Sequence, residues 1–424
     1  MLLTSQCFNH KVKKTIHVMA KPIGSKCNLD CQYCYYLSKE ELLAERSGAC
    51  EKMDEASLEA YIKQYFAAHN APQVNFSWQG GEPTMLGLDY FRTIVRLQKK
   101  YCPEGVEVLN DLQTNGTLLT DEWCRFLAKH QFLVGISIDG DEMLHNTYRT
   151  NRAGRGTWQQ VMVAIDLLKK HQVPFCTLTC VNRLTSQSPL EVYRFLRDVV
   201  QSPLIQFIPI VEPKTFRTQS PQASQCMQGD PRLSPSHPDS IVEHWSVEAK
   251  DWGVFLKTVF DEWYRHDVGR VHVQYFEALF ATWMGEQNPL CTLGELCGKG
   301  LAIEPNGDVY RCDHFVYPDY LAGNIHQSSL DEMAFSADQQ AFGYAKSKSL
   351  TTQCSSCPYL FACYGECPKN RIISSSTGER GHNYLCEGWY DFFRHIDEKL
   401  AHLLRINSLP VKHGHFKTNL KLER

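Results

Sequence analysis

The first half of the chain alternates short apolar runs with amphipathic stretches of helical period. The apolar runs predict strands over 15–24, 74–78, 106–116, 132–140, 173–181 and 204–212. Apolar positions three and four residues apart predict helices over 54–68, 88–101, 120–130, 157–171 and 189–201. Repeated β-then-α units with short connections indicate a parallel sheet with crossover helices. Six units are too few to close an eight-stranded barrel, so we expect an α/β fold with an open or partial barrel and functional residues at the carboxyl ends of its strands.

The second half of the chain has a different pattern. Residues 214–240 are rich in Pro, Ser and Gln and indicate a surface linker or insertion, and 248–267 are expected to be helical. A cysteine-rich region begins near residue 287. We therefore expect four parts, which are a partial barrel over 1–212, a linker and bridging helix over 213–286, a cysteine-rich domain over 287–390, and a C-terminal helix and tail over 391–424.

Charge and cysteine content narrow the function classes. The net charge of −3 favours neither a nucleic acid nor an anionic membrane as a partner. No apolar run approaches the ~20 residues of a membrane span, and no signal peptide is recognisable, so we expect a cytoplasmic protein. The 18 cysteines need a reason in such a protein. Without a secretion signal, metal binding or catalysis is favoured over a disulfide scaffold.

Three cysteines follow the first predicted strand with the spacing C-x3-C-x2-C, at Cys27, Cys31 and Cys34. A cubane iron–sulfur cluster usually has four thiolate ligands, so three of them leave one iron open to an outside molecule. Catalytic zinc also keeps an open position, but it favours His and carboxylate ligands alongside Cys, and only Asp30 lies near. The spacing favours an iron–sulfur cluster and indicates that one ligand comes from elsewhere.

This loop resembles the signature of radical S-adenosylmethionine (SAM) enzymes, including an aromatic residue between the last two cysteines. The stretch WQGGEP (78–83) is similar to the family's GGEP element. The resemblance implies that SAM completes the cluster and that these residues bind SAM: Tyr33, Gly81, Glu82, Ser137, Arg149 and Val211. In the family, GGEP holds the SAM amino group, while Ser137 and Arg149 would contact ribose and carboxylate, and Val211 would lie near the adenine.

The C-terminal region carries a second array of cysteines, at Cys291, Cys297, Cys312, Cys354, Cys357, Cys363, Cys367 and Cys386. Two zinc ribbons are one interpretation, but zinc sites usually pair two CxxC knuckles and only one occurs here. The array resembles the SPASM domain of radical SAM enzymes that modify peptides. The resemblance implies a partial (β/α)6 radical SAM barrel followed by a SPASM domain, with three 4Fe-4S clusters. One auxiliary cluster would use Cys291, Cys297, Cys312 and Cys367, and the other Cys354, Cys357, Cys363 and Cys386.

Asp313 directly follows a cluster cysteine in NGDVYRCDHFVYPDYLAGNI (306–325). This stretch, with QTNGTLL (113–119) and QFIP (206–209), resembles the anaerobic sulfatase-maturating enzymes over nearly the whole chain. The resemblance implies that SAM gives a 5′-deoxyadenosyl radical, which takes hydrogen from Cβ of a Cys or Ser in an unfolded sulfatase segment. Asp313 would be the base, with a pKa raised by partial burial, and the product would be Cα-formylglycine. An electron donor such as flavodoxin or ferredoxin is also implied.

Two side chains are expected either to face the peptide or to pack, Gln79 and Tyr36. Two other functions compete with sulfatase maturation. A SPASM enzyme that makes thioether or carbon–carbon links in another peptide fits the cysteine array equally well, but Asp313 and the resemblance over the whole chain disfavour it. A non-enzymatic iron–sulfur or zinc protein is disfavoured by the three-cysteine loop, because an electron carrier gains nothing from an open iron.

Overall fold

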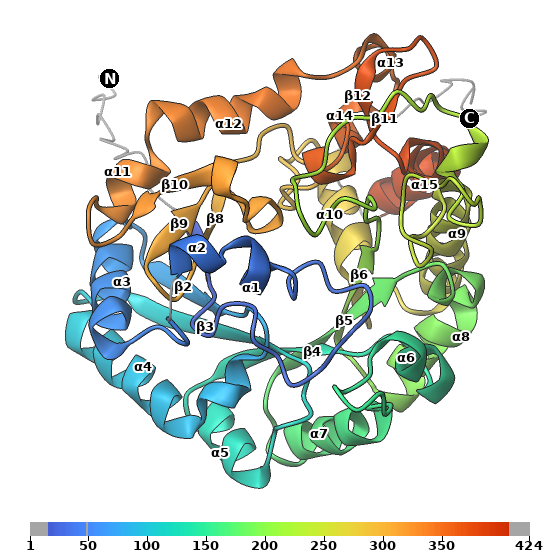
Figure 1. Ribbon diagram of the computed structural model, residues 1–424. Helices are drawn as coiled ribbons and strands as arrows, with labels where there is room; N and C mark the ends of the chain where they lie inside the picture. The colour runs from blue at the N-terminus through green and yellow to red at the C-terminus, as the bar shows by residue number, and fades with distance from the viewer. Residues whose placement is uncertain (1–15, 48–49, 407–424) are drawn as a thin grey trace, which may run out of the picture.

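A ten-stranded sheet forms the centre of the computed structural model, which describes residues 16–47 and 50–406 (Figure 1). Six neighbouring parallel strands follow one another in chain order: β1 (His17–Ala20), β2 (Gln73–Trp78), β3 (Glu107–Thr114), β4 (Phe132–Ser137), β5 (Phe175–Val181) and β6 (Leu204–Pro209). Side chains on both faces of β4 and β5 are mostly buried, as expected for a parallel sheet covered by helices. The predicted partial barrel of six units is confirmed.

Helices cover the outside of the sheet (Figure 1). They are α3 (Glu55–Ala67), α4 (Leu88–Tyr101), α5 (Asp121–Lys129), α6 (Glu142–Tyr148), α7 (Trp158–Lys170) and α8 (Pro189–Arg194). The side chain of Asp54 accepts from the amide of Ser57 at 2.7 Å and fixes the start of α3. The helix predicted over 189–201 is shorter than expected, because α8 passes into a π-helical turn at Phe195–Val199.

The cysteine-rich region adds strands to the same sheet, which the sequence did not predict. β8 (Gly300–Ile303) pairs in parallel with β1, and β9 (Asp308–Tyr310) and β10 (Leu321–Asn324) continue antiparallel. At the other edge, β7 (His272–Val273) pairs with β6. Because β8 lies beside β1, the loop after β9 reaches the carboxyl ends of the barrel strands. The second half of the chain therefore completes the wall of the site.

The expected linker over 214–240 packs against the cysteine-rich region. Phe216 is fully buried, and its carbonyl accepts from the hydroxyl of Tyr317 at 2.8 Å. The amide of Gln228 donates to the carbonyl of Ser374 in β11 (Ile373–Ser374) at 3.0 Å. The segment is therefore a structural connection between the barrel and the cysteine-rich region.

Four longer helices lie in the second half of the chain: α9 (Ala249–His266), α10 (Gln274–Trp283), α12 (Ala337–Lys348) and α15 (Cys386–Ile406). The shorter α-helices are α1 (Lys39–Leu42), α2 (Ala44–Ser47), α11 (Leu330–Ala334), α13 (Thr352–Ser355) and α14 (Leu360–Cys363), and β12 (Arg380–His382) pairs with β11. α9 confirms the helix predicted over 248–267. α15 begins at Cys386 and so crosses the boundary expected at residue 390. Within the described ranges, none of the helices has the length and apolar character that crossing a membrane requires.

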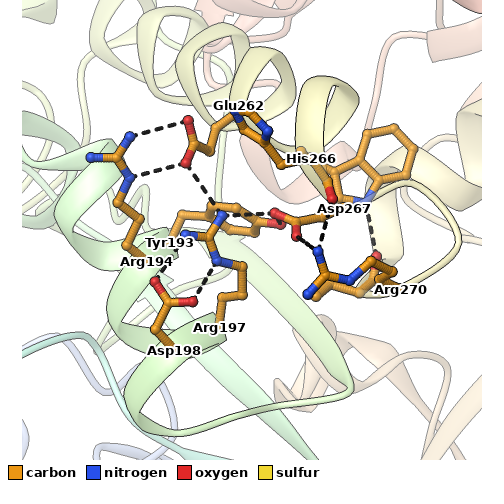
Figure 2. Close-up of polar contacts among 10 residues, drawn as sticks. Tyr193, Arg194, Arg197, Asp198, Glu262, His266, Asp267 and Arg270 are labelled. Atoms are coloured by element: carbon orange, nitrogen blue, oxygen red, sulfur yellow. Dashed lines mark hydrogen bonds and ion pairs between the residues drawn. The ribbon is translucent and has the colours of Figure 1, made fainter.

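A network of charges joins α8 to the end of α9 (Figure 2). Arg194 binds Glu262 at 3.0 Å, and Arg197 binds both Glu262 at 3.2 Å and Asp267 at 2.8 Å. The hydroxyl of Tyr193 donates to the same Asp267 at 2.8 Å. Each of these buried or half-buried carboxylates therefore has a cationic partner, and the network fixes the two helices on one flank of the sheet.

Candidate active site

A cavity of about 390 Å³ lies where the parallel strands end and the cysteine-rich region closes over them. It brings together many residues that the sequence singled out: Cys27, Cys31, Tyr33, Cys34, Tyr36, Gln79, Gly81, Ser137, Arg149 and Asp313. These residues come from distant parts of the chain. They meet because the carboxyl ends of parallel strands share one edge of the barrel.

Hydrogen bonds surround the thiol of Cys27. Its Sγ accepts from the amide of Leu29 at 3.3 Å and from the side-chain amide of Asn115 at 3.7 Å. Burial raises the pKa of the Cys27 thiol to about 11, and these two donors act in the opposite direction. Bound iron deprotonates such thiols. The sequence offered one signal for Asn115, its place in the QTNGTLL stretch at the end of β3.

The two glycines of WQGGEP allow close contact with the cysteine loop. The amide of Gly81 donates to the carbonyl of Gly24 at 2.8 Å, and a Cβ at Gly81 would lie 1.9 Å from the carbonyl oxygen of Lys26. A Cβ at Gly80 would lie 2.7 Å from the Gly24 oxygen, and Gly80 has a φ of +128°. The backbone that approaches these glycines is thus the segment leading into Cys27.

The side chain of Glu82 does not line the cavity, and its predicted contact with SAM stays a prediction. Glu82 is fully buried, and its carboxylate accepts from the amide and hydroxyl of Thr84, the hydroxyl of Thr114 at 2.7 Å and the amide of Asn115 at 2.7 Å. Burial raises the pKa of Glu82, and these donors oppose the shift. Through these four hydrogen bonds, Glu82 holds the glycine turn against the end of β3.

The predicted place of Val211 near the adenine also stays a prediction. Its side chain belongs to the main hydrophobic core and does not line the cavity, whereas those of Ile210 and Glu212 do. Successive side chains of an extended segment point to opposite sides, so only alternate residues after β6 face the cavity. The carbonyl of Val211 accepts from the ammonium of Lys369 at 2.8 Å.

A buried ion pair orients Arg149 in the cavity wall. Its Nε lies 2.8 Å from Oδ2 of Asp139, and a terminal nitrogen lies 3.1 Å from Oδ1. Asp139 is fully buried and also accepts from the hydroxyl of Tyr33 and from the amide of Cys180 at 2.9 Å. Asp139 was not predicted, although it lies two residues after Ser137, the last residue of β4, in the stretch SIDG (137–140). Asp139 links two of the residues that were expected to bind SAM.

Asp313 sits beside a buried lysine. Its Oδ1 lies 2.5 Å from the ammonium of Lys21, and its Oδ2 accepts from the hydroxyl of Tyr35 at 2.8 Å. Burial alone would raise the pKa of Asp313, but the positive charge of Lys21 and the neighbouring His314 outweigh it, so that the pKa is lowered. The expectation of a raised pKa is therefore wrong, because residue patterns do not place Lys21 next to this carboxylate.

Lys21 also accounts for the two side chains whose role was open. Its ammonium donates to Oε1 of Gln79 at 3.1 Å and lies 4.4 Å from the centre of the Tyr36 ring. The hydroxyl of Tyr36 donates to Glu304, whose pKa burial raises to about 7. Lys21 was missed, although a lysine directly after an apolar strand was a signal in the sequence. Gln79 and Tyr36 both line the cavity and contact Lys21.

The C-terminal cysteines gather in two places, and their assignment to two clusters stays a prediction. Cys354, Cys357, Cys363 and Cys386 line a second cavity of about 360 Å³. In the other set, the charges of Cys312 and Cys297 help to raise the pKa of Cys367, and those of Cys291 and Cys297 help to raise the pKa of Cys312. These four thiols therefore lie near one another. A zinc ion needs all its ligands within about 2.3 Å. No three His, Cys, Asp or Glu side chains in the described part of the chain are arranged to hold a single ion. The four thiols around the second cavity suit a multi-iron cluster.

Comparison with known proteins agrees with this geometry. The family model "Radical SAM superfamily" matches residues 22–196, and the SPASM "Iron-sulfur cluster-binding domain" matches 295–358. A serine-type anaerobic sulfatase-maturating enzyme of Bacteroides thetaiotaomicron is 43% identical over 383 residues, 90% of each chain. A cysteine-type enzyme of Clostridium novyi is 30% identical over 92% of this chain and 98% of its own. The solved structure of anSMEcpe with bound AdoMet and Kp18Cys peptide superposes with a TM-score of 0.78 at 28% identity, over 92% of this chain and 99% of that one. The chain therefore belongs to the family of anaerobic sulfatase-maturating enzymes, radical SAM proteins that carry a SPASM domain.

Proposed function

We propose that this protein oxidises a serine side chain in a sulfatase peptide to Cα-formylglycine. One observation carries the proposal, which is that Asp313, held by Lys21 at 2.5 Å, lines the same cavity as Cys27, Cys31 and Cys34. The higher identity to a serine-type relative, 43% against 30% for a cysteine-type one, supports serine as the substrate.

The proposed cofactors are SAM and three 4Fe-4S clusters, on the cysteine sets described above. When bound, SAM and the clusters would provide the chemistry that removes a hydrogen atom and an electron from the substrate. Tyr33, Gly81, Ser137 and Arg149 are the proposed SAM contacts in the cavity wall. Asp139 keeps Arg149 and Tyr33 in place through its ion pair and hydrogen bond.

Asp313 accepts the proton of the substrate hydroxyl. The serine loses a hydrogen atom from Cβ, a proton from oxygen and one electron, and these losses turn the alcohol into an aldehyde. Lys21 keeps Asp313 ionised at neutral pH, so the carboxylate is in the form that accepts a proton. A low basicity is sufficient because a hydroxyl on a carbon radical is far more acidic than that of an ordinary alcohol. Tyr35 and Lys21 fix the orientation of the carboxylate.

The peptide must enter as an extended segment, because the serine has to reach a cavity enclosed by strand ends and the cysteine-rich region. The reaction is therefore proposed to precede folding of the sulfatase, and the cytoplasm is the proposed compartment. A flavodoxin or ferredoxin is the proposed electron donor.

The substrate is tested by competition. Two peptides that differ only in carrying Ser-x-Pro-x-Arg or Cys-x-Pro-x-Arg are mixed in equal amounts with the reconstituted enzyme, SAM and a reductant under anaerobic conditions. We expect the serine peptide to lose the mass of two hydrogens first. Conversion of the cysteine peptide alone would contradict the serine assignment, and conversion of neither would contradict the proposed substrate class.

A further inference from the structure

Two buried cations lie within the cysteine array and take no part in the proposed reaction. Lys346 of α12 is 1% exposed, and its ammonium donates to the carbonyls of Cys291 at 2.7 Å, Thr292 at 2.9 Å and Gly294. Arg371 is 6% exposed. Its guanidinium donates to the carbonyls of Lys346, Tyr364, Gly365 and Glu366 and to the hydroxyl of Ser349.

No carboxylate forms a direct ion pair with either cation in the described part of the chain. All the hydrogen-bond acceptors of Lys346 and Arg371 there are carbonyl oxygens, apart from one hydroxyl. The carboxylate of Glu366 is bound by Asn370 at 2.9 Å and Asn383 at 2.6 Å; burial raises its pKa, and the charge of Lys346 acts against this rise. Removing two cations from water with no carboxylate in direct contact is strongly unfavourable. Further negative charge is therefore expected beside these two side chains.

The charge network between α8 and α9 shows a cation that is paired directly with carboxylates (Figure 2). There Arg197, which is less buried than Lys346 or Arg371, is matched by Glu262, Asp267 and Asp198. By contrast, no such ion pair is formed by Lys346 or Arg371 within the described residues.

Both cations act on the loops that carry the cysteines. Lys346 holds the turn between Cys291 and Cys297. Arg371 holds Tyr364, Gly365 and Glu366, three consecutive residues with φ of +44°, +67° and +54°. This left-handed run lies between Cys363 and Cys367, which belong to different cysteine groups. Arg371 thus fixes the point where the chain passes from one group to the other.

Both cations lie close to the group that contains Cys297. Lys346 donates to the carbonyl of Cys291, which belongs to this group, at 2.7 Å. Arg371 donates to the carbonyl of Glu366, the residue directly before Cys367 of the same group. The two positive charges are therefore placed next to the backbone that carries these cysteines.

We infer that Lys346 and Arg371 are the counter-charges of the auxiliary iron–sulfur clusters and raise the reduction potential of the cluster on Cys291, Cys297, Cys312 and Cys367. A four-iron cluster with four thiolates is an anion, and it gains a further negative charge when it takes up an electron. A fixed positive charge stabilises the reduced form more than the oxidised one, so it raises the potential. Both side chains are positioning residues. The inference rests on the ligand sets proposed above and is independent of the peptide substrate.

The test is a redox titration followed by electron paramagnetic resonance. The full-length protein with Cys27, Cys31 and Cys34 replaced by alanine retains only the auxiliary sites. In this background, Lys346→Gln and Arg371→Gln remove one charge each and keep hydrogen-bond donors. We expect unchanged iron content and a midpoint shifted to more negative potential, further in the double variant. Arg197→Gln, which loses a cation with carboxylate partners, is the matched control and should leave the midpoint unchanged.

Lys346→Arg and Arg371→Lys separate charge from loop geometry, because they keep the cation. Both are expected to retain iron and the parent midpoint. Full iron with an unchanged midpoint in the glutamine variants would overturn the inference. If the glutamine variants lose iron, retention in the charge-keeping variants supports it, and loss in all four overturns it in favour of a geometric role. If the protein without Cys27, Cys31 and Cys34 holds no iron, the proposed auxiliary ligand sets are wrong, and this inference is overturned with them. Peptide conversion by the wild type is a separate measurement and is not affected by that result.

Discussion

The pair between Lys21 and Asp313 makes a direct prediction about the pH dependence of the reaction. Lys21→Met removes the ammonium 2.5 Å from Asp313 Oδ1 and leaves the carboxylate buried with Tyr35 as its remaining donor. Burial then acts without opposition, so the pKa of Asp313 moves above its usual range. In the wild type, by contrast, the pKa of Asp313 is lowered and the carboxylate is ionised throughout the neutral range.

The size of the effect follows from the geometry of the pair. Two unit charges 2.5 Å apart attract by about 7 kcal/mol at an effective dielectric constant of about 20. The cost of removing both groups from water offsets part of this, and removing one partner of a buried pair costs about 3–5 kcal/mol. A general base contributes about 10²–10⁴-fold to a rate, so a mostly protonated Asp313 should lower product formation at neutral pH by about 10²-fold.

The assay follows peptide oxidation and deoxyadenosine formation separately, from about pH 6 to about pH 9. For the wild type we expect no acid limb from Asp313 in this range. For Lys21→Met we expect aldehyde formation to recover as pH rises. Stability should show the opposite trend, because a group with a raised folded pKa loses its stabilising contribution as pH increases through that pKa.

Lys26→Met is the matched control, since Lys26 is a half-exposed lysine of the same segment whose partner Glu51 is exposed. Its pH profile should equal that of the wild type. A Lys21→Met variant that keeps the wild-type profile and rate would refute the reasoning, because Asp313 would then be ionised without its cation.

Two further predictions concern folding of the site and of the scaffold. Gly81→Ala places a Cβ 1.9 Å from the Lys26 oxygen, so the cysteine loop must move, and iron analysis should show the loss of one cluster's iron. The control Gly300→Ala, whose Cβ would meet nothing closer than 3.6 Å, should retain all its iron. Arg197→Gln leaves the buried Asp267 with one fewer cation, and thermal unfolding should show a loss of about 2–3 kcal/mol while peptide oxidation is unchanged. Retained iron in Gly81→Ala, or unaltered unfolding in Arg197→Gln, would contradict the respective contact.

The six barrel strands were predictable because their signal is local. Runs such as FLVGIS in β4 and FCTLTCV in β5 are apolar on both faces, and in a parallel sheet covered by helices they have to be strands. The cysteine spacing was equally local. The positions of Cys27, Cys31 and Cys34 in one loop after β1 follow directly from the sequence.

The addition of β8 to the sheet could not be predicted. Its four residues, GLAI, carry little strand signal of their own, and they form a strand by pairing with His17–Ala20, far away in the chain. The contact between Lys21 and Asp313 depends on this pairing, and so does the lowered pKa of Asp313. The electrostatics of the site were therefore beyond the reach of residue patterns.

Side-chain direction was the other limit. The sequence placed Glu82 and Val211 near the cavity, and both lie in segments that border it. The direction of Glu82 is set by donors on Thr84, Thr114 and Asn115, which come from two different segments. That of Val211 is set by alternation after β6. Motif resemblance located the segments, and packing decided which side chains face inward.

The most direct test of the account compares the wild type with Asp313→Asn under anaerobic conditions. Both proteins receive SAM, a reductant and the Ser-x-Pro-x-Arg peptide, and deoxyadenosine and peptide mass are measured together. We predict that the wild type removes two hydrogens from the peptide for each deoxyadenosine formed, and that Asp313→Asn still forms deoxyadenosine but loses nearly all of the aldehyde. Equal aldehyde formation by both proteins would contradict the role of Asp313, and deoxyadenosine without any change of the peptide in the wild type would contradict the proposed reaction.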